Sequence, residues 1–152
     1  YKNKKSQRHM ITSIRWKKIA ATCTNTIKGP TEASNNLKIL GIKEHALKSL
    51  TEKQKLAEVD FMFTVKYAPE LATLEFEGTA IYINAKEKVI KLIKKWDKEK
   101  KIDQECVTPI FNNLLARCTT KALMMEEELG LPFHIPLPKI TPKTPTILPK
   151  AS

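Results

Sequence analysis

The residues with the widest chemical repertoire in this sequence are its three histidines, His9, His45 and His134. A histidine takes part in metal binding or in a catalytic triad only when cysteine, carboxylate or serine partners accompany it at suitable positions. Each of the three stands alone, with no carboxylate or cysteine at ligand spacing. The pattern therefore predicts neither a metal site nor a triad, and we expect surface or half-buried histidines.

A pair of carboxylates is the second candidate for chemistry, because Glu75 and Glu77 would share one face of a strand. Two acids on a solvated strand face usually keep a protein soluble. No GxxxxGK[ST] or GxGxxG sequence occurs, and four glycines offer little backbone for a loop that cradles phosphate. We therefore predict a protein that is not an enzyme and that needs no cofactor and no metal.

The cysteines also lack the pattern of a site. Cys23, Cys106 and Cys118 are odd in number, widely spaced and without a CxxC pair. This spacing predicts neither a disulfide framework nor a zinc knuckle. We expect free thiols that are buried or half-buried, as free cysteines commonly are.

Length and composition indicate one globular domain. The chain has 152 residues, of which 41% are apolar and 28% are charged, and these fractions are typical of a folded soluble protein. No apolar run approaches the roughly 20 residues that cross a bilayer, and no basic region precedes an apolar stretch at the start. We expect a cytoplasmic protein that is not inserted in a membrane.

The formal net charge of +11 favours an anionic partner, although part of it lies in a leader. Residues 1–10 are polar and basic without a structural pattern, and Met10 is a candidate translation start. Without the four cations of residues 1–9 the net charge would be +7. We therefore expect a disordered leader at 1–10 that need not be translated, a folded domain at 11–140 and a proline-rich tail at 141–152.

Alternation of apolar and polar residues predicts four strands. It is weak over Thr12–Ala20 and strong over Val59–Tyr67 and Leu74–Ile83, while Leu37–Ile42 is a short apolar run. Residues 22–33 carry loop chemistry, with Gly29-Pro30 among several threonines. The turn residues Ala68-Pro69-Glu70 separate the two strong strands, which predicts an antiparallel hairpin.

Two helices should follow. Apolar residues recur at helical spacing from Val89 to Trp96, with Asn84 and Glu87 spaced as a capping box, so a first helix should end near Lys98. Residues 97–103 are charged and predict a solvated connector. A second, longer helix should begin at Thr108-Pro109 and end before Gly130. Six of the nine prolines lie in residues 131–152, which must be extended.

This order of elements resembles the SecB family of protein-export chaperones. The residues that carry the likeness are the hairpin Glu58–Ile83, the helix Lys86–Lys98, the helix entry Thr108-Pro-Ile-Phe and the segment Leu131-Pro-Phe-His-Ile-Pro-Leu-Pro. In SecB-like proteins a proline and aromatic entry leads into the long helix, and short Phe-Pro and Leu-Pro stretches follow it. Archaeal SecB-like proteins end in a similar way after the second helix. The likeness spans roughly residues 11–140 and is one of pattern.

The resemblance implies an α+β fold in which a curved four-stranded antiparallel sheet carries two C-terminal helices on one face. It also implies assembly into a dimer or tetramer, and a chaperone that holds non-native or extended polypeptide in an apolar groove between sheet and helix. Each candidate side chain for this groove could instead belong to the core, because an alternating strand needs one buried face to fold. The candidates are Trp16, Phe61, Phe63, Tyr67, Phe76, Tyr82 and Met124.

One property departs from the family, since SecB proteins are typically acidic and this chain is basic. The charge supports an alternative, a protein that binds RNA or associates with the ribosome through lysine and arginine contacts to phosphate. These cations could equally serve only solubility. The candidates for phosphate contact are Arg15, Lys17, Lys18, Lys139 and Lys143.

Overall fold

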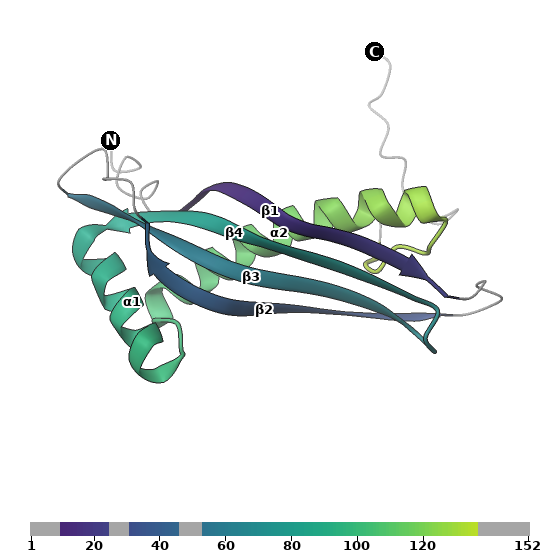
Figure 1. Cartoon of the computed structure of the whole chain (residues 1–152), viewed down its shortest axis with the longest axis horizontal. Helices are drawn as coiled ribbons and strands as arrows, with labels where there is room; N and C mark the ends of the chain where they lie inside the picture. The colour runs from purple at the N-terminus through teal and green to yellow at the C-terminus, as the bar shows by residue number, and fades with distance from the viewer. Residues whose placement is uncertain (1–9, 25–30, 46–52, 137–152) are drawn as a thin grey trace, which may run out of the picture.

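The computed structural model describes residues 10–24, 31–45 and 53–136 of the chain. Four long strands come first and two helices follow (Figure 1). The strands form one antiparallel sheet in the order β1-β4-β3-β2, and the helices pack against it, which confirms the predicted α+β fold. The elements are β1 (Met10–Cys23), β2 (Glu32–Glu44), β3 (Gln54–Ala68), β4 (Ala72–Ala85), α1 (Lys86–Glu99) and α2 (Gln104–Leu129).

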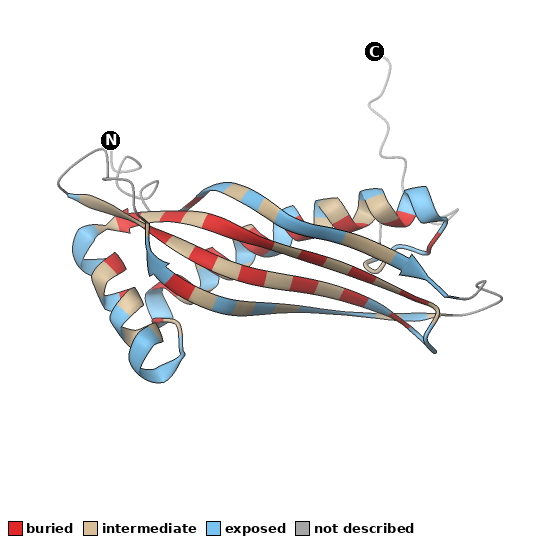
Figure 2. Cartoon of the chain, in the orientation of Figure 1, coloured by how far each residue is buried: buried red, intermediate tan, exposed pale blue. Residues whose placement is uncertain are grey.

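The two central strands form the predicted hairpin. Along β3 and β4 buried residues alternate with partly exposed ones (Figure 2), as period-2 patterning requires when helices cover one face. Phe63 and Phe76 lie opposite each other in the ladder, with stacked rings whose centroids are 6.3 Å apart. Ala68 and Pro69 are joined by a cis peptide bond in the turn.

All four strands are longer than their apolar patterns. The difference is largest in β2, where only 37–42 was predicted as strand and 22–33 as loop, yet Glu32–Glu44 pairs with β3. Backbone hydrogen bonds to a neighbouring strand do not depend on apolar side chains, so pairing continues into the polar residues at both ends. Hydrophobic alternation therefore located the strands and underestimated their length.

Helix α1 matches its predicted range, but the predicted capping box is wrong. The N-cap is Ala85, and no side chain caps the helix. Asn84 is instead buried in the core, where its amide donates to the Tyr82 hydroxyl at 2.8 Å and its carbonyl oxygen accepts from the backbone N–H of Ala85 at 2.7 Å. An amide engaged in this way cannot reach the first turn of the helix.

Helix α2 begins at Gln104, not at Thr108, so Pro109 lies inside it. The carbonyl of Asp103 accepts hydrogen bonds from the N–H groups of Cys106 and Val107, which starts the helix one turn earlier. Residues 97–101 are exposed, as predicted for a solvated connector, but Asp103 is only 6% exposed. Gly130 ends the helix at φ 68°, as predicted. Within the described part of the chain, no helix is both long and apolar enough to cross a membrane.

The buried residues of α2 recur at every fourth position. Because an α-helix advances about 100° per residue, a spacing of four rotates the buried line by about 40° at each step, so the helix crosses the strands obliquely. The first five members of this line are small or aliphatic, and the sixth is a carboxylic acid. The line consists of Cys106, Ile110, Leu114, Cys118, Ala122 and Glu126.

Glu126 holds the segment that follows α2. Its Oε2 atom lies 2.7 Å from Nδ1 of His134, its Oε1 accepts the backbone N–H of His134 at 3.2 Å, and both side chains are fully buried. The Tyr67 hydroxyl donates to the carbonyl of Pro132, and burial together with the neighbouring Glu126 raises the pKa of Tyr67. The residue His134 is half-buried, as predicted, although its side chain is fully enclosed.

Candidate functional site

An open groove of about 450 Å³ runs between β1 and α2. β1 is an edge strand, so the groove lies beside a strand that pairs on only one side among the described strands. Its lining is largely apolar, Met124 is 57% exposed on its helix side, and Lys121 Nζ lies over the Trp16 ring, 5.4 Å from the ring centroid. The lining residues are Ile14, Trp16, Ala116, Arg117, Thr120, Lys121 and Met124.

A glycine in β4 makes room for Trp16, which lines this groove. Gly78 pairs with Trp16 on one side and with Phe61 on the other. The two rings meet edge to face across the glycine, with centroids 5.7 Å apart. A Cβ on Gly78 would lie 2.7 Å from the carbonyl oxygen of Arg15 and 3.3 Å from the Phe61 ring. The missing side chain thus creates the space in which the aromatic pair forms.

Two of the seven predicted polypeptide-binding residues lie in the groove, namely Trp16 and Met124. The other five are at most 1% exposed and form the core between the sheet and the helices, so their contact with a bound polypeptide stays a prediction. These five are Phe61, Phe63, Tyr67, Phe76 and Tyr82.

On the helix side of the groove, sequence reasoning identified Met124 and missed the other four lining residues. Ala116, Thr120 and Met124 are spaced four residues apart, and Arg117 and Lys121 repeat the same spacing beside them. In the sequence, this spacing indicates a second face of the helix, next to the line of buried residues of α2.

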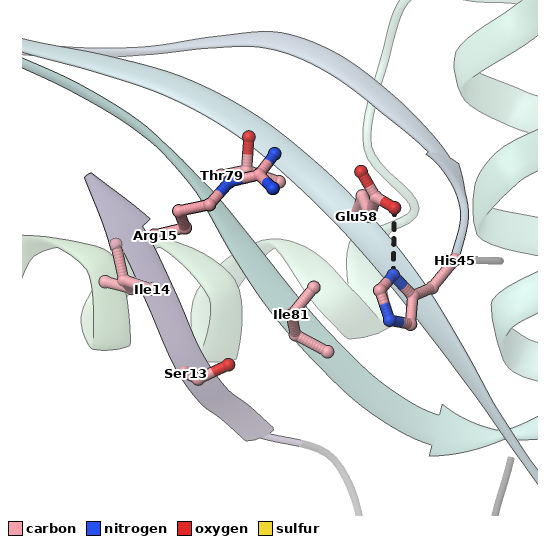
Figure 3. A pocket seen from close by; sticks show the side chains of 7 residues that line it. All are labelled: Ser13, Ile14, Arg15, His45, Glu58, Thr79 and Ile81. Carbon is pink, nitrogen blue, oxygen red and sulfur yellow. Dashed lines mark hydrogen bonds and ion pairs between the residues drawn. The ribbon is translucent and has the colours of Figure 1, made fainter. Parts of the chain in front are cut away.

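A smaller pocket of about 220 Å³ lies on the opposite face of the sheet (Figure 3). Its ionisable side chains are Arg15, His45 and Glu58, and His45 Nδ1 lies 2.8 Å from the Glu58 carboxylate. Ile81 lies between Ser13 and His45 in Figure 3, so the serine and the histidine are not arranged as a nucleophile and its base.

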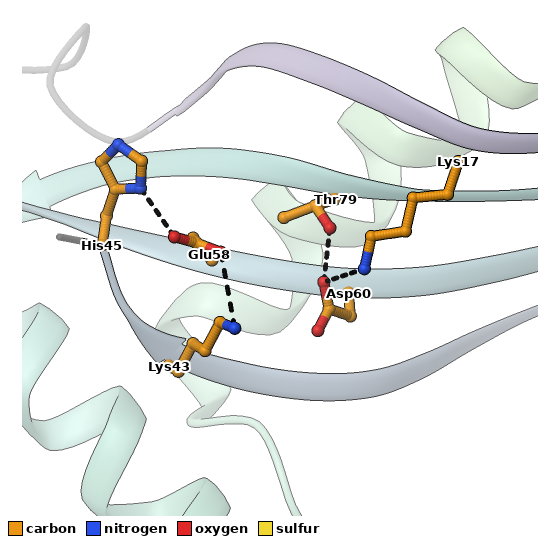
Figure 4. Close-up of polar contacts among 6 residues, drawn as sticks. All are labelled: Lys17, Lys43, His45, Glu58, Asp60 and Thr79. Carbon is orange, nitrogen blue, oxygen red and sulfur yellow. Dashed lines mark hydrogen bonds and ion pairs between the residues drawn. The ribbon is translucent and has the colours of Figure 1, made fainter. Parts of the chain in front are cut away.

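Glu58 and Asp60 on this face are already paired. Glu58 also contacts Lys43 at 3.8 Å, while Asp60 accepts from Thr79 at 2.5 Å and faces Lys17 at 3.5 Å (Figure 4). Among the residues that the structure describes, no cluster of three His, Cys, Asp or Glu side chains could hold a metal ion. We interpret this face as a network that neutralises its own charges.

The same pairing affects the predicted phosphate-binding cations. Lys17 faces Asp60, and Lys18 donates to Glu75 at 2.7 Å, a hydrogen bond that raises the pKa of Lys18. Arg15 lines the smaller pocket. Lys139 and Lys143 lie outside the described residues. Two of the three described cations are thus engaged with carboxylates, Lys17 with one on β3 and Lys18 with one on β4.

The thiols differ in exposure, and this makes a testable prediction. Cys23 is exposed, whereas burial raises the pKa of Cys118 to about 12 and also raises the pKa of Cys106. Since the thiolate is the reactive form, iodoacetamide at pH 8 should alkylate only Cys23 in the folded protein and all three cysteines in denaturant. Intact mass spectrometry measures this, and rapid native alkylation of Cys118 would contradict the described packing.

Comparison with solved structures finds a SecB-like chaperone with a similar fold. It is Rv1957 of Mycobacterium tuberculosis, solved in complex with a ChAD peptide from the Rv1956 HigA1 antitoxin. The TM-score is 0.50 at 14% sequence identity, and the likeness covers 93% of this chain and 95% of that one. No protein-family model and no curated protein matches the sequence. The chain therefore has a SecB-like α+β fold, and at this identity the likeness extends to the fold alone.

Proposed function

We propose that this protein is a chaperone-like binding protein that holds extended or non-native polypeptide segments in the groove between β1 and α2. The observation that carries the proposal is an apolar groove beside an open sheet edge, with Trp16 and Met124 inside it. Its structural neighbour is itself a chaperone in complex with a peptide, which supports the same kind of role here.

The groove offers two kinds of contact to an extended chain. Backbone groups on the outer edge of β1 can pair with an added strand, which gives affinity without sequence preference. Trp16 and Met124 then offer apolar surface, and methionine adapts its shape to different side chains. Arg117 and Lys121 in the lining favour segments that carry acidic residues.

The same edge would also suit a second copy of the chain. Assembly into a dimer or tetramer, as the SecB resemblance implies, belongs to this proposal, and so does a cytoplasmic location. A peptide and a second copy that both pair with β1 would compete, so binding should weaken as the protein concentration rises if self-association uses this edge.

Met124→Glu is the most direct test, because the side chain is 57% exposed and glutamate keeps helix propensity. A charge in the apolar groove should raise the Kd for a fluorescently labelled unfolded peptide about tenfold, a loss of about 1.4 kcal/mol. Fluorescence anisotropy gives the Kd, and light scattering of an aggregating client gives the holding activity.

Leu115→Glu is the matched control, since Leu115 is 36% exposed on the same helix and nine residues from Met124, which is half a turn out of phase. It should change the Kd by less than about twofold. An unchanged Kd in Met124→Glu, or an equal loss in both variants, would remove the groove from the proposal.

A further inference from the structure

Positive charge is concentrated on α1 and the residues that follow it. Residues 86–101 contain eight lysines and three acidic residues, and no arginine. We propose that the exposed face of α1 is a docking surface for the phosphate backbone of single-stranded RNA. This surface involves none of the residues of the polypeptide groove, and the proposal does not depend on the groove.

Lysines of α1 form a continuous exposed face. Val89 and Leu92 are buried against the sheet, while Lys91, Lys94 and Lys98 follow at spacings of three and four on the outer side. At 1.5 Å per residue these three lysines span roughly 10 Å along the helix. That length is sufficient to follow several phosphates of one strand.

Most of this charge is not neutralised. Lys88 pairs with Glu105 at 3.2 Å and Lys91 faces Asp103 at 3.6 Å. Lys94, Lys95 and Lys98 make no ion pair with any described residue. The basic residues of β1 differ in this respect, because Lys17 and Lys18 face carboxylates. The unpaired cations of α1 are therefore better placed to attract a polyanion.

The chemistry of this face favours phosphate over an acidic protein. A protein interface needs an apolar centre, and none of the described large apolar side chains that are exposed belongs to α1. The Trp96 ring is half-buried, and Lys100 lies over it at 5.8 Å, so it offers no open stacking platform for a base. Lysine point charges without base contacts predict binding that is independent of sequence.

α1 lies at one end of the sheet, whereas α2 runs along the sheet towards its other end (Figure 1). α1 contacts β2, β3 and β4, while the groove is formed by β1 and α2. Bound RNA would therefore leave the groove open, and the protein could hold a polypeptide near an RNA-containing particle.

Anisotropy of a labelled oligouridine of about 20 nucleotides tests the proposal across a salt series. Binding should be measurable at about 50 mM salt, with log affinity falling linearly against log salt by about 0.7 for each phosphate contact. The double variant K94Q/K98Q should bind about tenfold more weakly at low salt, with a slope smaller by about 1.4.

K38Q/K66Q is the matched control, because it also removes two exposed lysines that make no ion pair with a described residue. It should bind almost as the unaltered protein does, and both variants should retain the same thermal midpoint. Absent binding at low salt, or equal loss in the two variants, overturns the proposal. Equal affinity for polyglutamate of the same charge would also overturn it, since the partner would then be an acidic polypeptide.

Discussion

Glu126→Ala should lower the free energy of unfolding by about 2–6 kcal/mol, at about 1–3 kcal/mol for each of the two hydrogen-bond donors that lose this acceptor. Glu126 fills the sixth position of a line otherwise composed of small and aliphatic residues, and it is fully buried. Its carboxylate accepts both the ring and the backbone N–H of His134, so the substitution leaves two buried donors without a partner. Urea denaturation followed by circular dichroism measures the loss.

The neighbouring Glu128 supplies the control, because it is exposed on the same turn of α2. Glu128→Ala should change the free energy of unfolding by less than about 0.5 kcal/mol. A similar small effect in Glu126→Ala would mean that Glu126 is not held in the core by His134.

Replacing both partners with apolar residues tests whether the stability comes from their polar pairing or from the packing of their side chains. The double variant E126M/H134L removes both polar groups together, and replacing a buried polar pair with apolar side chains is often neutral or stabilising. We expect it to be more stable than Glu126→Ala, with the segment after α2 still packed on the sheet. If it is as unstable as Glu126→Ala, the stabilisation comes from shape, not from polar pairing.

The sequence predicted most of the fold because its strongest patterns are local. Alternation across 59–67 and 74–83, with a turn between them, was sufficient for the hairpin, and helical periodicity located α1 and the end of α2. The start of α2 was missed because a threonine and proline pair is also compatible with a helix interior, where it removes one hydrogen bond. In the structure the buried Asp103 is the N-cap, and its carbonyl accepts the first hydrogen bonds of the helix.

The site was less predictable because it depends on strand order. Trp16 and Phe61 are both aromatic residues on the inner face of alternating strands, and their local sequences do not distinguish core from groove. Trp16 lies on edge strand β1 and remains partly exposed, whereas Phe61 lies on a central strand and is fully buried. The pairing of Glu126 with His134 likewise required the reversal of the chain at Gly130. A glutamate in the buried line of α2 indicates that a polar partner lies nearby, but the sequence alone does not identify that partner as His134.

Gly78→Val should destabilise the protein by about 3 kcal/mol and displace Trp16 from the groove. A Cβ at this position would lie 2.7 Å from a backbone oxygen of β1, and backbone cannot move aside as a flexible side chain can. The added methyl groups would also enter the space where Trp16 meets Phe61. We therefore expect a lower urea midpoint, a shifted tryptophan emission spectrum and weaker peptide binding in the same variant.

Gly41→Ala distinguishes this steric effect from the general cost of changing a strand glycine. A Cβ on Gly41 would meet only the Asp60 carboxylate, at an ordinary contact distance of 3.6 Å. Gly41→Ala should therefore be neutral or stabilise by up to about 1 kcal/mol, because alanine loses less backbone entropy on folding. If Gly78→Val folds as stably as Gly41→Ala and binds peptide normally, the close approach of β1 to β4 does not position Trp16. The groove would then depend on α2 alone.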